Sequence, residues 1–134
     1  WFGCRHGIPA LRRSGGGSVI NTASFVALVG AATPQLAYTA SKGGVLAMTR
    51  ELAVIHAREG IRVNALAPGY IETDLNRDFF ASDAGLRLIS RIPQKRLGQL
   101  HDLDGPLLLL CSDQSRYMTG AVIAVDGGHL VSGL

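Results

Sequence analysis

Apolar residues fall along this chain in short runs that alternate with longer amphipathic stretches. The runs of strand length, each bounded by glycine, proline or polar residues, are 18–22, 61–66 and 121–125. Helices are expected over 2–13, 35–58, 84–90 and 101–111; apolar residues recur at helical spacing in 35–58, and 84–90 is weakly amphipathic. Gly60 is placed to end the longest of these helices. Pro106 requires the last helix either to begin late or to kink.

The alternation of helices with strands predicts an α/β fold with a parallel sheet. The composition agrees, because 47% of the residues are hydrophobic and only 17% are charged. Strands of a parallel sheet are covered on both faces and are therefore apolar on both. We expect a sheet of parallel strands with helices on each side of it.

Candidate chemistry lies at the start of the long helix, where Tyr38 precedes Lys42 by four residues. Residues four apart share one face of a helix. A cation beside a phenol favours the phenolate, so the pair is suited to proton transfer. Tyr38 is therefore a candidate general acid or base at a carbonyl or alcohol oxygen. A lone Tyr-x-x-x-Lys pattern arises often by chance, and its neighbours decide its meaning.

Those neighbours form an ordered set. Ser24 ends the first strand run, fourteen residues before Tyr38, and the second run stops at Pro68 and Gly69. In this order and spacing the motifs resemble the short-chain dehydrogenase/reductase family over nearly the whole chain, from residue 15 to residue 128. The sequence is similar to the 3-oxoacyl-carrier-protein reductase and glucose dehydrogenase members of that family.

The resemblance implies an NAD(P)-dependent oxidoreductase that interconverts a secondary alcohol and a ketone, with NAD or NADP as cofactor. It implies that Tyr38 transfers the proton, that Lys42 also hydrogen-bonds the nicotinamide ribose, and that Ser24 holds the reacting oxygen. The plainer explanations are a helix-surface tyrosine, a solvated lysine and a turn serine. The joint presence of all three residues favours the catalytic interpretation.

The same resemblance implies roles for several further residues. Pro68 and Gly69 would close the floor of a nicotinamide pocket, because glycine permits close approach to a flat ring. The backbone of Ile71 and the hydroxyl of Thr73 would hold the carboxamide. Segment 73–95 resembles a substrate lid. Its candidate pocket walls, which could equally pack on the body of the protein, are Leu75, Phe79, Phe80 and Leu86.

Features of the family's first half are not found in this sequence. No strand is followed by a Gly-x-x-x-Gly-x-Gly turn, and Gly15 to Gly17 precede a strand instead. The family's catalytic asparagine would fall before Trp1. We therefore interpret the chain as the C-terminal, catalytic part of a Rossmann-type doubly wound sheet whose N-terminal half is missing. We expect the chain alone to bind NAD(P)H weakly and strand 18–22 to expose an unpaired edge.

Other function classes are disfavoured. The net charge of +3 comes from 13 basic and 10 acidic residues without a basic stripe that would suit nucleic acid. The histidines are dispersed along the chain and do not occur at the spacing typical of metal ligands; they are His6, His56, His101 and His129. Cys4 and Cys111 are expected to be reduced, buried thiols, which fits a cytoplasmic protein. The apolar run 107–111 is too short to cross a membrane.

Two alternatives stay open. The chain could belong to a non-catalytic subunit that keeps the long helix and the last strand as oligomer surfaces, or to a binding protein on the same fold. The resemblance implies dimer or tetramer contacts through those two elements, so we expect a homo-oligomer in either case. Activity restored by supplying an N-terminal half would favour the enzyme.

Overall fold

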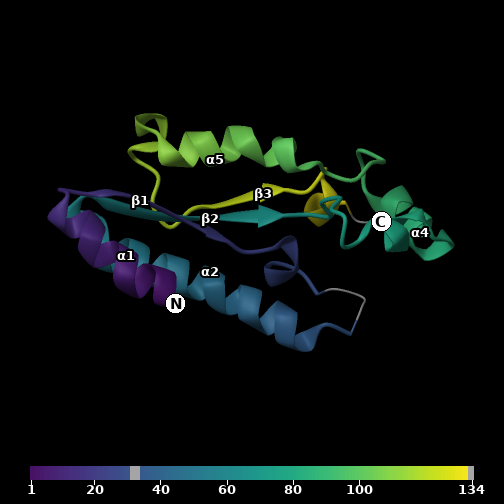
Figure 1. Cartoon of the computed structure of the whole chain (residues 1–134), viewed down its shortest axis with the longest axis horizontal. Coiled ribbons are helices and arrows are strands. Elements are labelled where there is room, and N and C mark those ends of the chain that lie inside the picture. The colour runs from purple at the N-terminus through teal and green to yellow at the C-terminus, as the bar shows by residue number, and fades with distance from the viewer. Residues whose placement is uncertain (31–33, 133–134) are drawn as a thin grey trace.

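A three-stranded parallel sheet forms the centre of the protein (Figure 1). The computed structural model describes residues 1–30 and 34–132. The strands are β1 (Gly17–Thr22), β2 (Ile61–Pro68) and β3 (Val122–Val125), in the order β1-β2-β3. The expected parallel α/β fold is confirmed, and β2 extends to Pro68, two residues further than the apolar run indicated.

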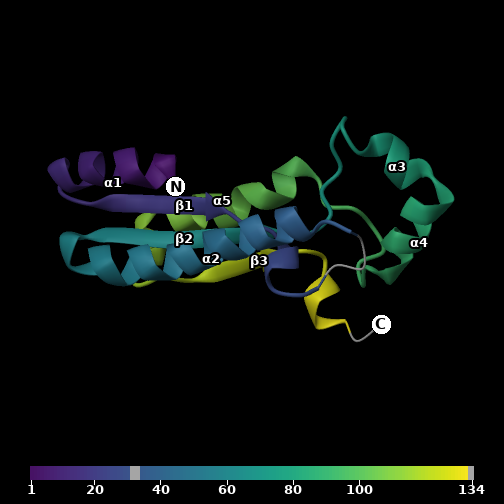
Figure 2. The same ribbon diagram turned by 90° about the horizontal axis from the view of Figure 1, so that it is seen from below.

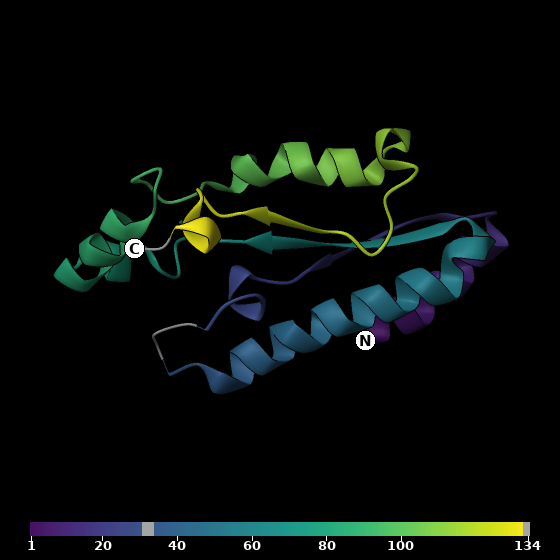
Figure 3. The same cartoon turned by 180° about the vertical axis from the view of Figure 1, so that it is seen from behind.

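Helices cover both faces of the sheet. The α-helices are α1 (Phe2–Arg13), α2 (Leu36–His56), α3 (Arg77–Ala81), α4 (Asp83–Arg91) and α5 (Asp104–Cys111). Figures 1 and 3 show α1 and α2 on one face and α5 on the other. This layering explains why the strands are apolar on both sides. None of the helices in the described ranges is long and apolar enough to span a bilayer.

The core is centred on β2, the middle strand. Val63, Ala65 and Ala67 are each 0% exposed. On the face covered by α1 and α2, Val63 joins a cluster that includes Ile8 and Ala53.

In the described structure β1 pairs only with β2, so its other edge is unpaired.

Three local features differ from, or add to, the sequence analysis. The short helix α3 was not expected, and it precedes the expected amphipathic helix α4. Pro106 is the third residue of α5, where its missing N–H breaks no intrahelical bond; the helix begins late and does not need to kink. The expectation of two buried thiols is wrong for Cys111, which is exposed, whereas Cys4 is buried.

The carboxyl ends of the strands meet at one end of the sheet. Figure 2 shows α3 and α4 extending beyond that end. Gly60, with φ +69°, adopts the left-handed conformation that ends the helical segment after α2 and starts β2, as expected. In open α/β sheets the crevice at the carboxyl ends is the usual place for ligands, so this end is the expected location of a site.

Candidate active site

Ser24 lies two residues beyond the end of β1. Its extended backbone (φ −164°, ψ 156°) caps the 3₁₀ turn Phe25–Ala27, and its Oγ accepts a 3.4 Å hydrogen bond from the Val26 N–H. The residue is 6% exposed. A hydroxyl that accepts one bond keeps its own proton free to donate, so Ser24 can donate to an oxygen atom of a bound ligand.

Tyr38 and Lys42 lie on one face of the first turns of α2. The Lys42 Nζ is 5.6 Å from the centre of the Tyr38 ring. The same ammonium donates a 3.1 Å hydrogen bond to the carbonyl oxygen of Thr22, the last residue of β1. One of its three protons thus ties the helix to the strand end, and the other two can serve further partners.

A single cavity of about 350 Å³ brings these residues together. It lies at the carboxyl ends of β1 and β2 and beside α2. Its lining comprises Thr22, Ala23, Ser24, Phe25, Val26, Gln35, Tyr38, Lys42, Pro68, Gly69, Tyr70, Ile71, Asn76 and Phe80. Every candidate catalytic residue named from the sequence is among them, and so are three of the added cofactor residues, Pro68, Gly69 and Ile71.

Gly69 has a packing reason for lacking a side chain. A Cβ there would lie 2.7 Å from the Cα of Asp126, which follows β3. The glycine therefore allows the loops after β2 and β3 to approach each other. Close approach to a ligand is not needed to explain it.

Thr73 is separated from the cavity lining. It lies beside Arg77, Gln99 and His101 in a neighbouring hollow. Its backbone N–H donates a 2.8 Å bond to the Oδ1 of Asn76. Asn76 itself lines the cavity, and the sequence analysis missed it because no local pattern distinguishes this asparagine within the segment after Thr73.

The four candidate lid residues occupy different environments. Phe80, on α3, is 7% exposed and lines the cavity. The others are outside the lining: Leu75 is 98% exposed, Phe79 48% and Leu86 56%. Helical geometry places neighbouring residues on different faces, which is why Phe79 and Phe80 separate.

An aromatic cluster closes one side of the cavity. The ring of Tyr70 lies 4.9 Å from Phe25 and 6.0 Å from Phe80 between centroids, and His129 packs against Phe25 and Tyr70. Burial raises the pKa of the Tyr70 phenol. Of the two tyrosines in the cavity, Tyr70 is therefore held neutral among rings, and Tyr38 is the one beside an ammonium.

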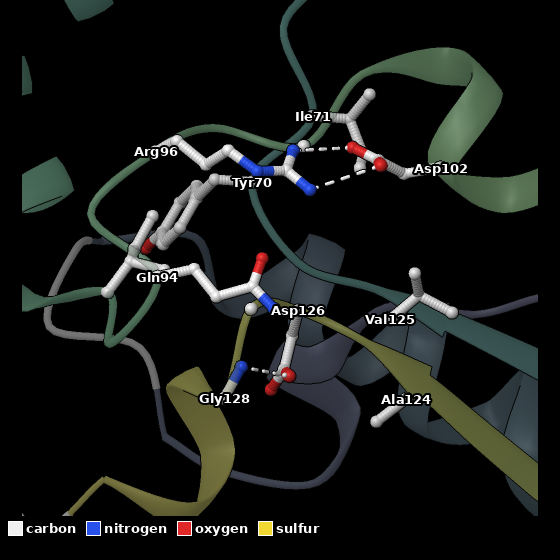
Figure 4. Close-up of a pocket in the computed structure, with 12 residues that line it drawn as sticks. Tyr70, Ile71, Gln94, Arg96, Asp102, Ala124, Val125, Asp126 and Gly128 are labelled. Atoms are coloured by element: carbon white, nitrogen blue, oxygen red, sulfur yellow. Dashed lines mark hydrogen bonds and ion pairs between the residues drawn. The ribbon is translucent and has the colours of Figure 1, made fainter.

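A second cavity of about 350 Å³ adjoins the first and shares Tyr70 and Ile71 with it. Figure 4 shows it between the 92–98 segment and the end of β3, with Arg96 paired to Asp102. Arg96 holds the pKa of the Asp102 carboxyl down at about 2, chiefly through the hydrogen bonds that it donates. In the described ranges no three His, Cys, Asp or Glu side chains cluster as metal ligands.

Fold and site define the class: an α/β protein with the last strands of a Rossmann-type sheet and a serine, tyrosine and lysine around one cavity. A family model described as enoyl-(acyl carrier protein) reductase matches residues 1–129. The chain belongs to the short-chain dehydrogenase/reductase family.

Individual relatives agree. The chain is 43% identical over 118 residues to L-rhamnose 1-dehydrogenase (NAD(P)(+)) from Azotobacter vinelandii, covering 87% of this chain and 46% of the relative. It is 40% identical over 125 residues to 3-oxoacyl-[acyl-carrier-protein] reductase from Thermotoga maritima, covering 92% and 50%. The chain thus spans about half the length of these curated relatives.

Solved structures show the same likeness. A gluconate 5-dehydrogenase from Burkholderia cenocepacia, in complex with NADP and tartrate, superposes with a TM-score of 0.88. The two sequences are 34% identical, and the match covers 96% of this chain and 51% of that one. The fold therefore corresponds to one half of a family subunit.

Proposed function

We propose that this chain is the catalytic part of an NAD(P)-dependent oxidoreductase that interconverts a secondary alcohol and a ketone. The observation that carries the proposal is the single cavity at the strand ends, which Ser24, Tyr38 and Lys42 line together. Ser24 comes from a different element than the other two, so a shared cavity is not a consequence of sequence proximity. The relatives named above are dehydrogenases and reductases, which supports the same reaction class.

In this proposal Tyr38 gives a proton to the substrate oxygen during reduction and removes it during oxidation. Ser24 donates a hydrogen bond to that oxygen and holds it close to the phenol. Lys42, fixed by the Thr22 carbonyl, keeps a positive charge beside the Tyr38 ring. When bound, the nicotinamide supplies or accepts the hydride.

The cavity fits the nicotinamide end of such a cofactor. Pro68 and Gly69 provide a floor without long side chains, and Ile71 lines the same space. Across residues 1–30 and 34–132, no protein acceptor pairs with the Ile71 backbone N–H. That donor is free for a carboxamide oxygen. The NADP complex of the gluconate dehydrogenase relative supports NADP, and the name of the L-rhamnose dehydrogenase relative supports either cofactor.

The proposal extends to the surroundings of the site. Segment 73–95 is a substrate lid that contributes Phe80 to the cavity wall. The full-length protein is cytoplasmic. It is also a homo-oligomer, which is supported by apolar residues left exposed on α2, such as Leu36 at 84% and Val54 at 79%. Sedimentation velocity of the full-length protein tests the assembly, and a monomer at micromolar concentration would contradict it.

The central test is Tyr38→Phe in the full-length protein. Removing the hydroxyl should lower kcat by roughly 10²–10⁴-fold, the usual share of acid–base catalysis, and leave cofactor affinity within about twofold. The matched control is Tyr117→Phe, at a fully exposed tyrosine outside the cavity lining, which should keep wild-type kcat. Retained turnover in Tyr38→Phe contradicts the assignment.

We also propose that residues 1–134 alone bind the cofactor weakly and turn over negligibly. In this fold family the dinucleotide lies across the sheet crevice and needs a phosphate-binding turn that this sequence does not contain. Titration of the chain with NAD(P)H, followed by nicotinamide fluorescence, should give no saturation in the micromolar range. Micromolar binding would refute this part of the proposal.

A further inference from the structure

Asn76 makes a paired contact with the segment that follows Gly69. Its Oδ1 accepts from the Thr73 N–H at 2.8 Å, and its Nδ2 donates to the Ile71 carbonyl oxygen at 2.9 Å. Its own backbone N–H donates to the Thr73 carbonyl oxygen at 3.1 Å. The amide orientation follows from these partners, because an acceptor faces an N–H and a donor faces a carbonyl.

The opposite side of the same segment is held by Gly98. Gly98 donates its N–H to the Tyr70 carbonyl at 2.9 Å and accepts from the Glu72 N–H at 2.8 Å. Arg96 and Asp102 brace this second stretch of chain through hydrogen bonds of 2.6 and 3.1 Å, drawn in Figure 4. The segment 70–73 is thus fixed from two sides, and Asn76 is the side chain on the side of the active-site cavity.

Asn76 also lies directly before α3, the first helix of the proposed lid. Its backbone carbonyl accepts from the Phe80 N–H at 3.1 Å, and α3 starts at the next residue. Phe80 lines the same cavity as Ile71. One residue therefore links the backbone around Ile71 to the helix that carries an aromatic wall of the cavity.

We propose that Asn76 is a positioning residue that fixes the backbone at Ile71 for binding the amide-bearing nicotinamide ring, using Thr73 as its second anchor. The inference rests on the proposed function, which assigns the Ile71 backbone to the cofactor. Asn76 does not touch the reacting atoms. It acts by restraining Ile71 and Thr73, so its loss should weaken cofactor binding and leave the Tyr38 proton transfer intact.

The first test concerns the restraint itself and needs no activity. In the full-length protein, Asn76→Ala should raise the exchange rate of the Thr73 amide hydrogen by roughly tenfold or more, because its acceptor is gone. The matched control is Asp78→Ala, an exposed residue of the short helix α3, which should leave that rate unchanged. An unchanged Thr73 rate in Asn76→Ala would overturn the inference.

The second test is kinetic. Asn76→Ala should raise the KM for the cofactor by roughly tenfold, the effect of one or two neutral hydrogen bonds, while kcat at saturating cofactor changes by less than about twofold. Asn76→Asp keeps an acceptor for the Thr73 N–H and loses the donor to Ile71. It should therefore preserve slow exchange at Thr73 and still raise the KM for the cofactor, because the bond to Ile71 is gone.

The outcomes separate this inference from the proposed function. An active enzyme whose cofactor KM is unchanged in Asn76→Ala, despite faster exchange at Thr73, would contradict the positioning role alone. A fall in kcat with no change in KM would contradict it as well. If the unmodified full-length protein neither binds nor uses NAD(P)H, the proposed function fails and this inference fails with it.

Discussion

The middle strand β2 and segment 73–95, the proposed lid, differ sharply in burial. β2 is buried along most of its length, with Val63 and Ala65 at 0% exposure. Segment 73–95, beyond the strand ends, leaves Leu75 98% and Phe79 48% exposed. Between the two lies the cavity, with Pro68 and Gly69 from the strand side and Phe80 from the lid.

Under the proposed function, proton transfer and closure of the cavity belong to these two different parts of the protein. The residues proposed for chemistry stand at the end of β1 and on α2, elements that the sheet core holds in place. The lid contributes only Asn76 and Phe80 to the cavity. A rigid sheet gives the precision that proton transfer needs, whereas a segment with few buried side chains can open at low free-energy cost. Three predictions test this division.

The largest expected effect is at Asn64, a fully buried polar residue of β2. Its Nδ2 donates to the Met118 carbonyl and its Oδ1 accepts from the Ala121 N–H, both at 2.9 Å. Asn64→Ala empties a fully buried position and leaves two part-buried backbone groups without their side-chain partner, so it should lower the free energy of unfolding by about 4 kcal/mol. Urea denaturation measures the change.

Leu75→Ala is the matched control from the lid. Because this side chain is almost fully exposed, its loss should change the free energy of unfolding by less than about 0.5 kcal/mol. Equal effects at Asn64 and Leu75 would remove the distinction between core and lid.

The second prediction compares two neighbouring phenylalanines inside the lid. Phe80→Ala removes a buried ring that packs on Tyr70 and should cost about 3 kcal/mol, together with a higher KM for substrate. Phe79→Ala, at a half-exposed ring, should cost less than about 1 kcal/mol and leave KM near its original value. Thermal denaturation and steady-state kinetics of the full-length variants measure both. A larger loss at Phe79 would mean that the other face of α3 closes the cavity.

The smallest expected effect is electrostatic and concerns the ion pair between Arg96 and Asp102, just after segment 73–95. The pKa of Asp102 is about 2 in the folded protein, against an ordinary value of 3.8. A lowered folded pKa stabilises the protein above the unfolded value, and that contribution is lost as the pH falls from about 4 towards 2. Asp102→Asn should make the free energy of unfolding depend less steeply on pH between about pH 4 and 2.

Asp78→Asn serves as the control for that pH series, since no described residue forms an ion pair with the exposed Asp78. It should retain the slope of the unmodified protein between pH 4 and 2. An identical slope in Asp102→Asn and the unmodified protein would show that the Arg96 pair does not stabilise the folded state.

Local patterns in the sequence were sufficient for most of the fold. Apolar runs, helical spacing and Gly60 predicted the parallel sheet and its main helices, because burial on two faces imposes an apolar composition on each strand. The same reasoning could not reveal α3, a helix of five residues that is too short for a periodic pattern. It also misjudged Cys111, since an apolar neighbourhood in sequence does not determine which face of α5 is covered.

The sequence by itself determined that a tyrosine and a lysine share one helix face, because their spacing equals about one helical turn. Only the tertiary structure decided which other residues surround them. It brought Ser24, Ile71 and Phe80 to the same cavity, separated Thr73 from its lining, and added Asn76. The reason is that parallel strands bring together chain segments tens of residues apart, and such proximity depends on register and packing rather than on local spacing.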